Sequence, residues 1–360
     1  MATIYDVARI AGVSAKTVSR VLNSDAPVGK GTREAVEAAI AELGFVPSNA
    51  ARMMRSQRSR LIGLITGAIS MSPEPTQPAG LPELFIVQGI QKALAGSGMT
   101  LMIADTGGVI ERAAPLIDTF VRHRVEGLIY VAEYHQRVKL PALPAGTPMV
   151  LVNCFDDRST VAIVPDDRRG QHDLVARLVL AGHRRIGYLT LRTEMVAAQL
   201  RREGYAQALA EAGIAYDPVL VENCDLEGRD GETQLLWDAI DRMLRLSNPP
   251  SVLCCGNDKM ALRVYGILRS MGRRVPSEVS VAGYDNHRVI AETLYPPLTT
   301  VDLPYTAMGV RAAQRLISLI SGEIREEKGP TLVAGPVYWR ESVTELRPAN
   351  VYQLKSVKEE

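Results

Sequence analysis

Four polar residues end or follow apolar runs in the body of the chain and could together bind hydroxyl groups. Asn153 ends PMVLVN, Asn257 follows SVLCCG, and Asp285 ends VSVAGYD, while Arg201 lies on a predicted helix after RIGYL. Arginine can donate two parallel hydrogen bonds to vicinal hydroxyls, a carboxylate accepts from them, and asparagine does both. Any one residue alone could be a structural polar group, but the set predicts a site for a small polyol at the carboxyl ends of strands.

The segment IYDVARIAGVSAKTVSRVLN, residues 4–23, has a pattern that could read DNA. Gly12 permits a tight turn between two short helices, and Ser14 can cap the second. The inner faces would be formed by Ile4, Val7, Ala8, Ala11, Val18, Val21 and Leu22. The outward positions would be Ala15, Lys16, Thr17, Ser19, Arg20 and Asn23. This pattern predicts a helix-turn-helix, whose second helix enters the major groove; the alternative is a plain helical hairpin with solvated polar residues.

The charge distribution favours the DNA-binding interpretation. The formal net charge of all 360 residues is only +1. Residues 1–60, however, hold nine Lys and Arg against five Asp and Glu, and the rest of the chain is slightly acidic. A basic N-terminal module on a mildly acidic body suggests binding to nucleic acid, and Arg20 is suited to a bidentate contact with guanine.

Composition and length exclude several classes of protein. The chain is 46% hydrophobic, 22% charged and 5% aromatic, which is typical of a globular protein rather than a disordered or membrane one. No apolar run reaches the roughly 18 residues of a membrane helix, and the N-terminus lacks an export signal, so we expect a cytoplasmic protein. The four cysteines have no metal-ligand or secreted-domain spacing and are expected to be buried thiols: Cys154, Cys224, Cys254 and Cys255.

The sequence carries no motif for catalysis. None of the five histidines lies in an H-E-x-x-H pattern, and neither G-x-S-x-G nor a phosphate loop occurs. GKGTRE, at residues 29–34, lacks the preceding strand and the first glycine of a phosphate loop. Asp258 could be imagined as a general base, but no acid/base pair can be placed. We therefore expect no enzymatic activity, no cofactor and no metal ion.

The elements that must position these residues fall into two parts. Residues 1–46 contain three short helical segments, with Gly44 and Pro47 as a stop signal, and residues 47–60 form a basic linker or a helix that folds on binding. From Leu61 on, apolar strands alternate with helices, which predicts parallel sheets covered on both faces. About 280 residues of this pattern are more than one sheet uses, so we expect two α/β lobes with a cleft between them. The expected bounds are 61–160 plus 290–325 for the first lobe, 161–289 plus 326–345 for the second, and 346–360 for a tail.

Motifs along the whole chain match a known family in order. They begin with TIYDVARIAGVSAKTVSRVLN and TREAVEAAIAELGFVPSNAAR, and continue with LIGLI, VEGLI, VNCFDD, the D-x-x-G from Asp167 to Gly170, GHRRIGYL, RREGYAQAL, CGNDKMALRVYGILRSMG, VSVAGYD and YPPLTTVD. This series resembles the lac and gal repressor family of bacterial transcription regulators. The resemblance implies an all-α helix-turn-helix head with a hinge helix, then an α/β core of two lobes like a periplasmic binding protein, with two parallel sheets flanked by helices.

The resemblance also implies roles for residues of the head and hinge. The positions that contact phosphates or flank the bases are Tyr5, Ser14, Thr17, Ser19, Asn23 and Thr32. The positions that choose the sequence are Ala15, Lys16 and Arg20. The implied hinge contacts are Asn49, Arg52 and Met54, with Met54 as the apolar wedge that enters the minor groove. This chain departs from the family in having Met54 where leucine is usual and Pro47-Ser48 where Pro-Asn is usual.

In the body, the resemblance implies effector binding by the same four polar residues, Asn153, Arg201, Asn257 and Asp285. Further candidates for the wall of the site are Glu133, Leu226 and Tyr305. The segment SMSPEPTQPAGLPE, residues 70–83, holds four prolines and is expected to be a loop. It is longer than the usual connection of the family, so we expect it to border the cleft and to adapt the pocket to a disaccharide or glycoside.

These observations predict a sequence-specific DNA-binding repressor controlled by a small carbohydrate effector. It would bind a pseudo-palindromic operator as a homodimer, because one head reads only half a site. The tail NVYQLKSVKEE has no apolar heptads, so the coiled-coil tetramer of the lac repressor is not expected. The alternatives are an effector-only sugar-binding protein of the periplasmic type and a sugar-modifying enzyme. Whether the effector releases or recruits DNA stays open, although release is the commoner behaviour in the family.

Overall fold

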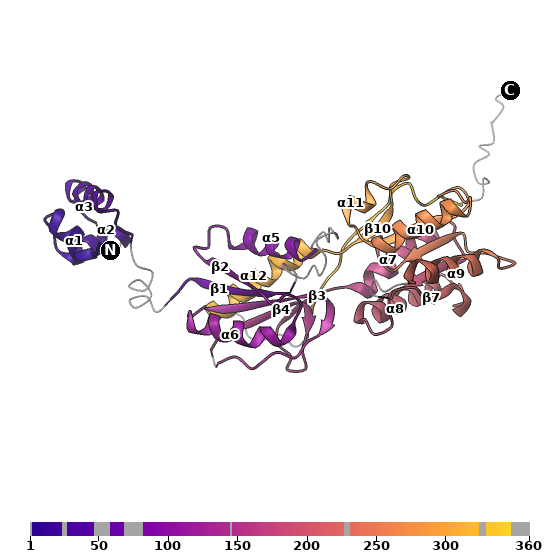
Figure 1. The fold of residues 1–360 in the computed structure, drawn as a ribbon, viewed down its shortest axis with the longest axis horizontal. Helices are drawn as coiled ribbons and strands as arrows, with labels where there is room; N and C mark the ends of the chain where they lie inside the picture. The colour runs from indigo at the N-terminus through magenta and orange to yellow at the C-terminus, as the bar shows by residue number, and fades with distance from the viewer. Residues whose placement is uncertain are drawn as a thin grey trace, which may run out of the picture. The chain divides into compact units, whose positions relative to one another are not determined.

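The computed structural model describes residues 2–23, 27–46, 58–67, 82–144, 146–226, 231–323 and 329–346. The chain divides into two compact units. The first, called the head, is Met1–Leu61 with Arg124–Glu126, and the second, called the core, is Ile62–His123 with Gly127–Glu360. Figure 1 shows the helices of the head and the two sheets of the core.

The head contains three helices, α1 (Ile4–Ile10), α2 (Ala15–Asn23) and α3 (Lys30–Leu43). A capping box begins α1, since the backbone N–H of Asp6 donates to Thr3 and that of Thr3 donates to the Asp6 carboxylate. Gly12 has a φ of 63° in the turn, where a side chain would be strained. The hydroxyl of Ser14 accepts from the backbone N–H of Thr17 at the start of α2. The predicted turn and cap are therefore confirmed.

The small core of the head uses the inner helix faces that the sequence predicts. Val7, Val18 and Val36 come from the three different helices and are all fully buried. Ile4, Ala11 and Leu22 are partly buried against this cluster. Each helix therefore depends on the other two for burial of its apolar face, because a helix this short is marginal in water by itself.

The first sheet of the core has six strands in the order β11-β5-β4-β3-β1-β2. The strands are β1 (Leu61–Thr66), β2 (Thr100–Asp105), β3 (Gly127–Arg137), β4 (Met149–Phe155), β5 (Ala162–Pro165) and β11 (Thr331–Val333). The ladders that join β1, β3, β4, β5 and β11 are parallel. Runs such as Ile62–Thr66 are buried at every position, as expected for parallel strands covered on both faces.

The second sheet also has six strands, in the order β12-β10-β9-β8-β6-β7. The strands are β6 (Ile186–Thr190), β7 (Val221–Asn223), β8 (Val252–Cys255), β9 (Ser280–Asp285), β10 (Thr299–Asp302) and β12 (Val337–Tyr338). All of its ladders are parallel except that of β12 with β10, which is antiparallel. The carboxyl ends of β6, β8 and β9 therefore meet at one edge of this sheet.

Helices cover both sheets and complete two lobes. The first lobe is the first sheet with α5 (Pro82–Leu94), α6 (Ala113–Arg122) and α12 (Tyr305–Ser321). Figure 1 shows α5 and α12 on one side of this sheet and α6 on the other. The second lobe is the second sheet with α7 (Asp167–Leu180), α8 (Val196–Glu211), α9 (Glu232–Leu244), α10 (Asp258–Ser270) and α11 (Arg288–Ala291). Two 3₁₀ turns complete the described elements, η1 (Ile110–Arg112) and η2 (Pro218–Leu220).

The lobe boundaries expected from the sequence are wrong at three strands. β5 and β11 belong to the first sheet, although residues 161–289 and 326–345 were expected in the second lobe. β10 belongs to the second sheet, although residues 290–325 were expected in the first lobe. The chain passes from one lobe to the other three times, after β5, after β10 and after β11. Each of these crossings takes only a few residues, and the residue composition does not change there. The sheet to which a strand belongs is decided by its pairing partners: β5 pairs with the preceding strand β4, β10 pairs with the preceding strand β9, and β11 pairs with β5, which is distant in sequence.

The structure describes only part of the loop, hinge and tail segments that the sequence predicts. Of the segment 70–83 expected as a loop, residues 70–81 lie outside the described part, and Pro82 begins α5, because proline is tolerated in the first turn of a helix. The hinge residues 47–57 and the tail from 347 on also lie outside it. The four cysteines are free and buried, as predicted. Among the described helices, none is long and apolar enough to span a bilayer.

Candidate functional site

The head presents a polar and aromatic surface around α2. Lys16 and Arg20 are exposed, and the Tyr5 side chain is 73% exposed. The ion pairs within the described head residues join Arg9 to Asp6 and Lys30 to Glu34, so neither involves the α2 cations. An exposed helix with unneutralised cations and an exposed tyrosine beside it is the kind of surface that contacts a phosphate backbone and base edges.

Not all predicted head residues point outward. Ala15 is the first residue of α2; it is partly buried and packs against the core of the head. Its expected outward orientation is therefore wrong, because it shares the inner face of α2 with Val18 and Leu22. The Ser14 and Thr17 hydroxyls hydrogen-bond each other at 2.9 Å. Ser19 and Thr32 are partly exposed. The side chain of Asn23, and the hinge residues Asn49, Arg52 and Met54, lie outside the described residues.

The core contains a pocket of about 200 Å³ between its lobes. It is lined, among the described residues, by Tyr134, His135, Asn153, Pro165, Asp167, Leu191, Arg192, Met195, Ala197, Arg201, Asp225, Asn257, Asp285, Leu303 and Tyr305. The lining brings together all four residues of the predicted polyol site, and Tyr305 with them. Side chains from both sheets meet there, as the cleft predicted from the sequence requires.

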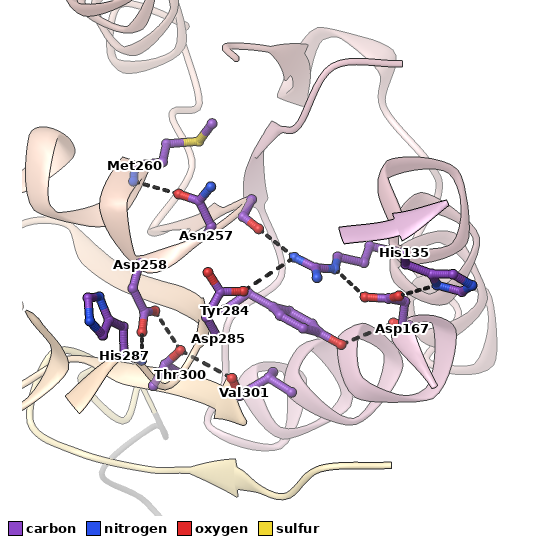
Figure 2. Close-up of polar contacts among 12 residues, drawn as sticks. His135, Asp167, Asn257, Asp258, Met260, Tyr284, Asp285, His287, Thr300 and Val301 are labelled. Carbon is purple, nitrogen blue, oxygen red and sulfur yellow. Dashed lines mark hydrogen bonds and ion pairs between the residues drawn. The ribbon is translucent and has the colours of Figure 1, made fainter. Parts of the chain in front are cut away.

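Arg201 is the centre of a buried polar network in this pocket. Figure 2 labels Asp167, Tyr284 and Asp285, which belong to this network. Its Nε–H donates to Asp167 Oδ1 at 2.7 Å, and its Nη1–H donates to the carbonyl oxygen of Gly256, also at 2.7 Å. Asp285 Oδ1 lies 4.0 Å from Nη1. Two of the five N–H groups of the guanidinium are thus used to fix it. Its orientation is set before any ligand arrives, which favours binding.

The two carboxylates beside Arg201 differ in charge behaviour. Burial raises the pKa of Asp167, but Arg201 and His135 outweigh it and hold that pKa below its usual value, so Asp167 is ionised. Burial raises the pKa of Asp285 well above its usual value, more than the nearby Arg201 lowers it. Asp167 therefore neutralises Arg201, and Asp285 can exchange hydrogen bonds with a hydroxyl as acceptor or, when protonated, as donor.

The two asparagines of the site are held by the backbone. The Asn153 Nδ2–H donates to the carbonyl of Ala132 at 3.2 Å, and its residue has a φ of 60°. Asn257 caps α10, with its Oδ1 accepting from the N–H of Met260 at 2.7 Å. Each amide keeps a second polar atom for other partners. Both therefore combine a structural role with a place in the pocket wall.

Two of the predicted wall residues do not reach the pocket lining. Glu133 is half-buried beside Thr106 and Gly67, where burial first and then the charge of Asp105 raise its pKa. Leu226 follows Asp225 but does not itself line the pocket. The Asp258 carboxylate is also outside the lining: it accepts from the Thr300 hydroxyl and the His287 N–H (Figure 2). Burial raises its pKa to about 7, while these two hydrogen bonds oppose the rise.

Sequence reasoning missed five polar or aromatic lining residues, Tyr134, His135, Asp167, Arg192 and Asp225. Asp167 and Asp225 could have been found, because each lies two residues after the end of a short strand, β5 and β7, and Asp285 likewise lies at the carboxyl end of a strand, β9. No comparable signal marks Tyr134 or His135, which lie inside a strand. In the part of the chain that the structure describes, no group of three His, Cys, Asp or Glu is placed to hold a metal ion.

Comparison with known proteins places these features in a family. Residues 3–48 match the model of the bacterial regulatory proteins of the lacI family, and residues 175–343 match that of a periplasmic binding protein-like domain. The HTH-type transcriptional repressor PurR of Vibrio atlanticus (strain LGP32) is 32% identical over 332 residues, which are 91% of this chain and 95% of that protein.

Two solved structures are similar over most of the chain. The lac repressor dimer bound to operator and the anti-inducer ONPF has a TM-score of 0.75 and 27% identity, over 95% of this chain and 99% of that one. A complex of the transcriptional regulator CelR with cellobiose has a TM-score of 0.61 and 29% identity, over 95% of this chain and 100% of that one.

A helix-turn-helix head followed by a two-lobed core like a periplasmic binding protein defines a class of DNA-binding transcription regulators. The chain belongs to the lacI family of bacterial regulatory proteins.

Proposed function

We propose that the protein is a repressor that binds a pseudo-palindromic operator as a homodimer and responds to a small neutral carbohydrate in the core pocket. The head and the pocket occur on one chain, and this combination is the observation that carries the proposal. A periplasmic-type binding protein would need the pocket but not the head. Because operator DNA of a bacterium lies in the cytoplasm, the proposal also places the protein there.

The surface of the head supports the DNA-binding part of the proposal. Lys16 and Arg20 lie four residues apart on α2, so they share one face of the helix. An exposed Arg on such a face can contact guanine with two hydrogen bonds, and a lysine nearby can contact bases or phosphates. The relative described as a lac repressor dimer is bound to operator, which supports a dimer here as well.

The pocket supports a neutral, hydroxyl-rich effector. Arg201 is already neutralised by Asp167, so it can donate hydrogen bonds but offers little net charge to a phosphate or a sugar acid. The other charged lining residues, Arg192, Asp225 and Asp285, include both signs, so the lining offers no excess of positive charge to an anion. Amides, carboxylates and a fixed guanidinium together suit hydroxyl groups, and the CelR relative is in complex with cellobiose.

The size of the pocket narrows the class of effector. About 200 Å³ is less than the roughly 300–1,000 Å³ of pockets for drug-sized ligands. The volume within the described residues therefore favours a single sugar ring over the disaccharide or glycoside expected from the sequence. Tyr134 and Tyr305 line the pocket as well, and aromatic faces pack against the C–H surfaces of sugar rings.

Two measurements on the full-length protein test this function. Selection from random double-stranded DNA should enrich a two-fold symmetric site whose half-sites are about one helical turn apart. A thermal-shift screen with monosaccharides, cellobiose, sugar phosphates and nucleobases should show a raised midpoint for a neutral sugar, because a ligand that binds only the folded state stabilises it. Enrichment without symmetry would contradict the dimeric operator complex, and stabilisation only by sugar phosphates or nucleobases would contradict the neutral carbohydrate.

A further inference from the structure

The strand β3 departs from regular pairing where it reaches the pocket. It pairs with β4 up to Val131 and then again from Gln136, so the four residues between lie opposite the single residue Asn153. A bulge of this kind breaks the normal alternation of side chains, and bulges are common beside functional sites. Here two consecutive side chains, Tyr134 and His135, line the pocket.

His135 of β3 in the first lobe contacts the start of α7, where the chain passes from β5 into the second lobe. On its own side, the ring packs edge-on against Phe155 of β4, with the centroids 5.8 Å apart. On the other side, its Nδ1 lies 2.9 Å from Oδ2 of Asp167, the first residue of α7 (Figure 2). Because an ionised carboxylate can only accept, Nδ1 carries the hydrogen. The side chains are 5% and 0% exposed, so water does not compete for this bond.

Tyr134 makes a second contact across the pocket. The guanidinium carbon of Arg192, which follows β6 of the second lobe, lies 5.8 Å from the centroid of the Tyr134 ring. A cation at this distance is attracted to an aromatic face. Two successive residues of the first lobe therefore contact two charged residues of the second, one by a hydrogen bond and one by a ring.

We infer that Tyr134 and His135 form a clasp that holds the two lobes together over the pocket, and that His135 is a positioning residue for Arg201. His135 binds one oxygen of Asp167, and the Nε–H of Arg201 donates to the other. Loss of the His135 bond removes one of the two side-chain partners of that carboxylate, and Asp167 then holds Arg201 less rigidly. The consequence for the effector rests on the proposed function, whereas the clasp is a property of the core alone.

Spin labels on the two lobes measure the clasp directly. The four native cysteines are buried, so cysteines introduced at the exposed positions Asp118 of α6 and Thr233 of α9 can carry the labels. Double electron–electron resonance then gives the distance between the lobes in the full-length protein. His135→Phe keeps an aromatic ring against Phe155 but removes the hydrogen bond. We expect a second, longer population of distances, with the closed-to-open ratio lowered roughly tenfold or more.

Two further variants separate a clasp from general stability. His135→Asn can place an amide N–H near the position of Nδ1 and should restore the wild-type distances. His172→Phe is the matched control, because His172 also lies on α7 and also hydrogen-bonds carboxylates, those of Asp173 and Glu211, but all three residues belong to the second lobe. It should leave the distances unchanged.

The outcomes decide the inference without DNA or carbohydrate, so its failure is distinguishable from failure of the proposed function. Wild-type distances in His135→Phe would overturn the clasp, and so would an equal lengthening in His172→Phe. If His135→Phe does not fold, Arg192→Gln tests the second contact in the same way: a longer population supports the clasp, and unchanged distances overturn it.

Discussion

The guanidinium carbon of Arg201 lies 3.5 Å from the centroid of the Tyr284 ring, so the cation stacks on the residue that precedes Asp285. Its in-plane N–H groups meanwhile bond to Asp167 and to the carbonyl of Gly256. A flat guanidinium can stack and donate in its plane at the same time, and an ammonium cannot. A lysine at position 201 would therefore keep the positive charge but lose both the stacking and the paired in-plane donors, so one substitution tests the geometry apart from the charge.

Arg201→Lys should weaken the binding of the carbohydrate and leave operator binding intact. The lysine keeps the charge that Asp167 needs, but it loses the stacking and the fork. We expect the affinity for the sugar found by thermal shift to fall about tenfold to a hundredfold, measured by calorimetry. Operator affinity, measured by fluorescence anisotropy, should not change because the proposed base readers lie in the head. Loss of both would indicate a misfolded core, and an unchanged sugar affinity would show that Arg201 is only structural.

Arg20→Ala should reduce sequence preference, not merely attraction to DNA. If its contact is bidentate to guanine, the loss is roughly 1–3 kcal/mol on the selected operator and much less on random DNA. Arg9→Ala is the matched control, because Arg9 is an exposed cation of the same head on α1. It should weaken binding to operator and random DNA alike. Equal losses in Arg20→Ala on both DNAs would assign Arg20 to phosphate contact.

Gly309→Ala should destabilise the core through the contact of α12 with α5. A Cβ at Gly309 would collide with the backbone carbonyl of Ile86, which cannot move without shifting the helix. We expect a loss of about 1–3 kcal/mol in urea unfolding. Gly266→Ala is the control: it lies exposed within α10 with nothing near its added Cβ, so it should gain about 0.5–1 kcal/mol. A stabilised Gly309→Ala would show that the two helices can separate freely.

Removal of His172 should cost stability chiefly at acidic pH. Hydrogen bonds to Glu211 and then Asp173 raise the pKa of His172 in the folded protein. Its stabilisation is therefore complete below the unfolded pKa of about 6.5 and disappears as the pH rises through the higher folded pKa. The difference in urea midpoint between wild type and His172→Gln should be largest near pH ~5.5 and small near pH ~9. A difference independent of pH would show that the imidazolium does not contribute.

The contribution of His183 to stability should depend on pH in the opposite way to that of His172, so the two histidines can be compared in the same protein. Burial lowers its pKa, and the neutral ring bonds the Ser251 hydroxyl at 2.7 Å and donates to the Thr344 carbonyl at 3.0 Å. The folded pKa lies below the unfolded one, so this contribution is present above pH ~6.5 and is lost as the pH falls. His183→Gln should therefore lose most stability at neutral and alkaline pH. A loss that grows toward acidic pH would contradict the neutral ring.

Local signals in the sequence located the parts of the site but not their pairing. The turn at Gly12 and the cap at Ser14 depend on neighbouring residues, and both are confirmed. Asn153 and Asp285 follow from the rule that ligands bind at the carboxyl ends of parallel strands. The expectation for Ala15 was wrong although periodicity could have corrected it, because Ala15 lies three residues before Val18 and seven before Leu22 and so shares their inner face.

The bond between His135 and Asp167 lies beyond such rules. The two residues are 32 positions apart, and they meet only because a bulge in one lobe reaches the first turn of a helix in the other. No periodicity in the sequence specifies that bulge. A similar reason explains the misassignment of β11, whose partner β5 is distant in sequence.

The three crossings between the lobes also govern how the protein is made. The first lobe is begun by β1 and completed only by α12 and β11, which are synthesised after the whole second lobe up to β10. In the folded protein, Ile86 and Ile90 of α5 share a core cluster with Met308 and Leu316 of α12. We therefore expect Ile86 and Ile90 to stay exposed to solvent on the ribosome until α12 has been synthesised. A nascent chain arrested before Tyr305 should consequently be a chaperone client, and a nonsense mutation late in the gene should disable the earliest-made lobe as well as the last.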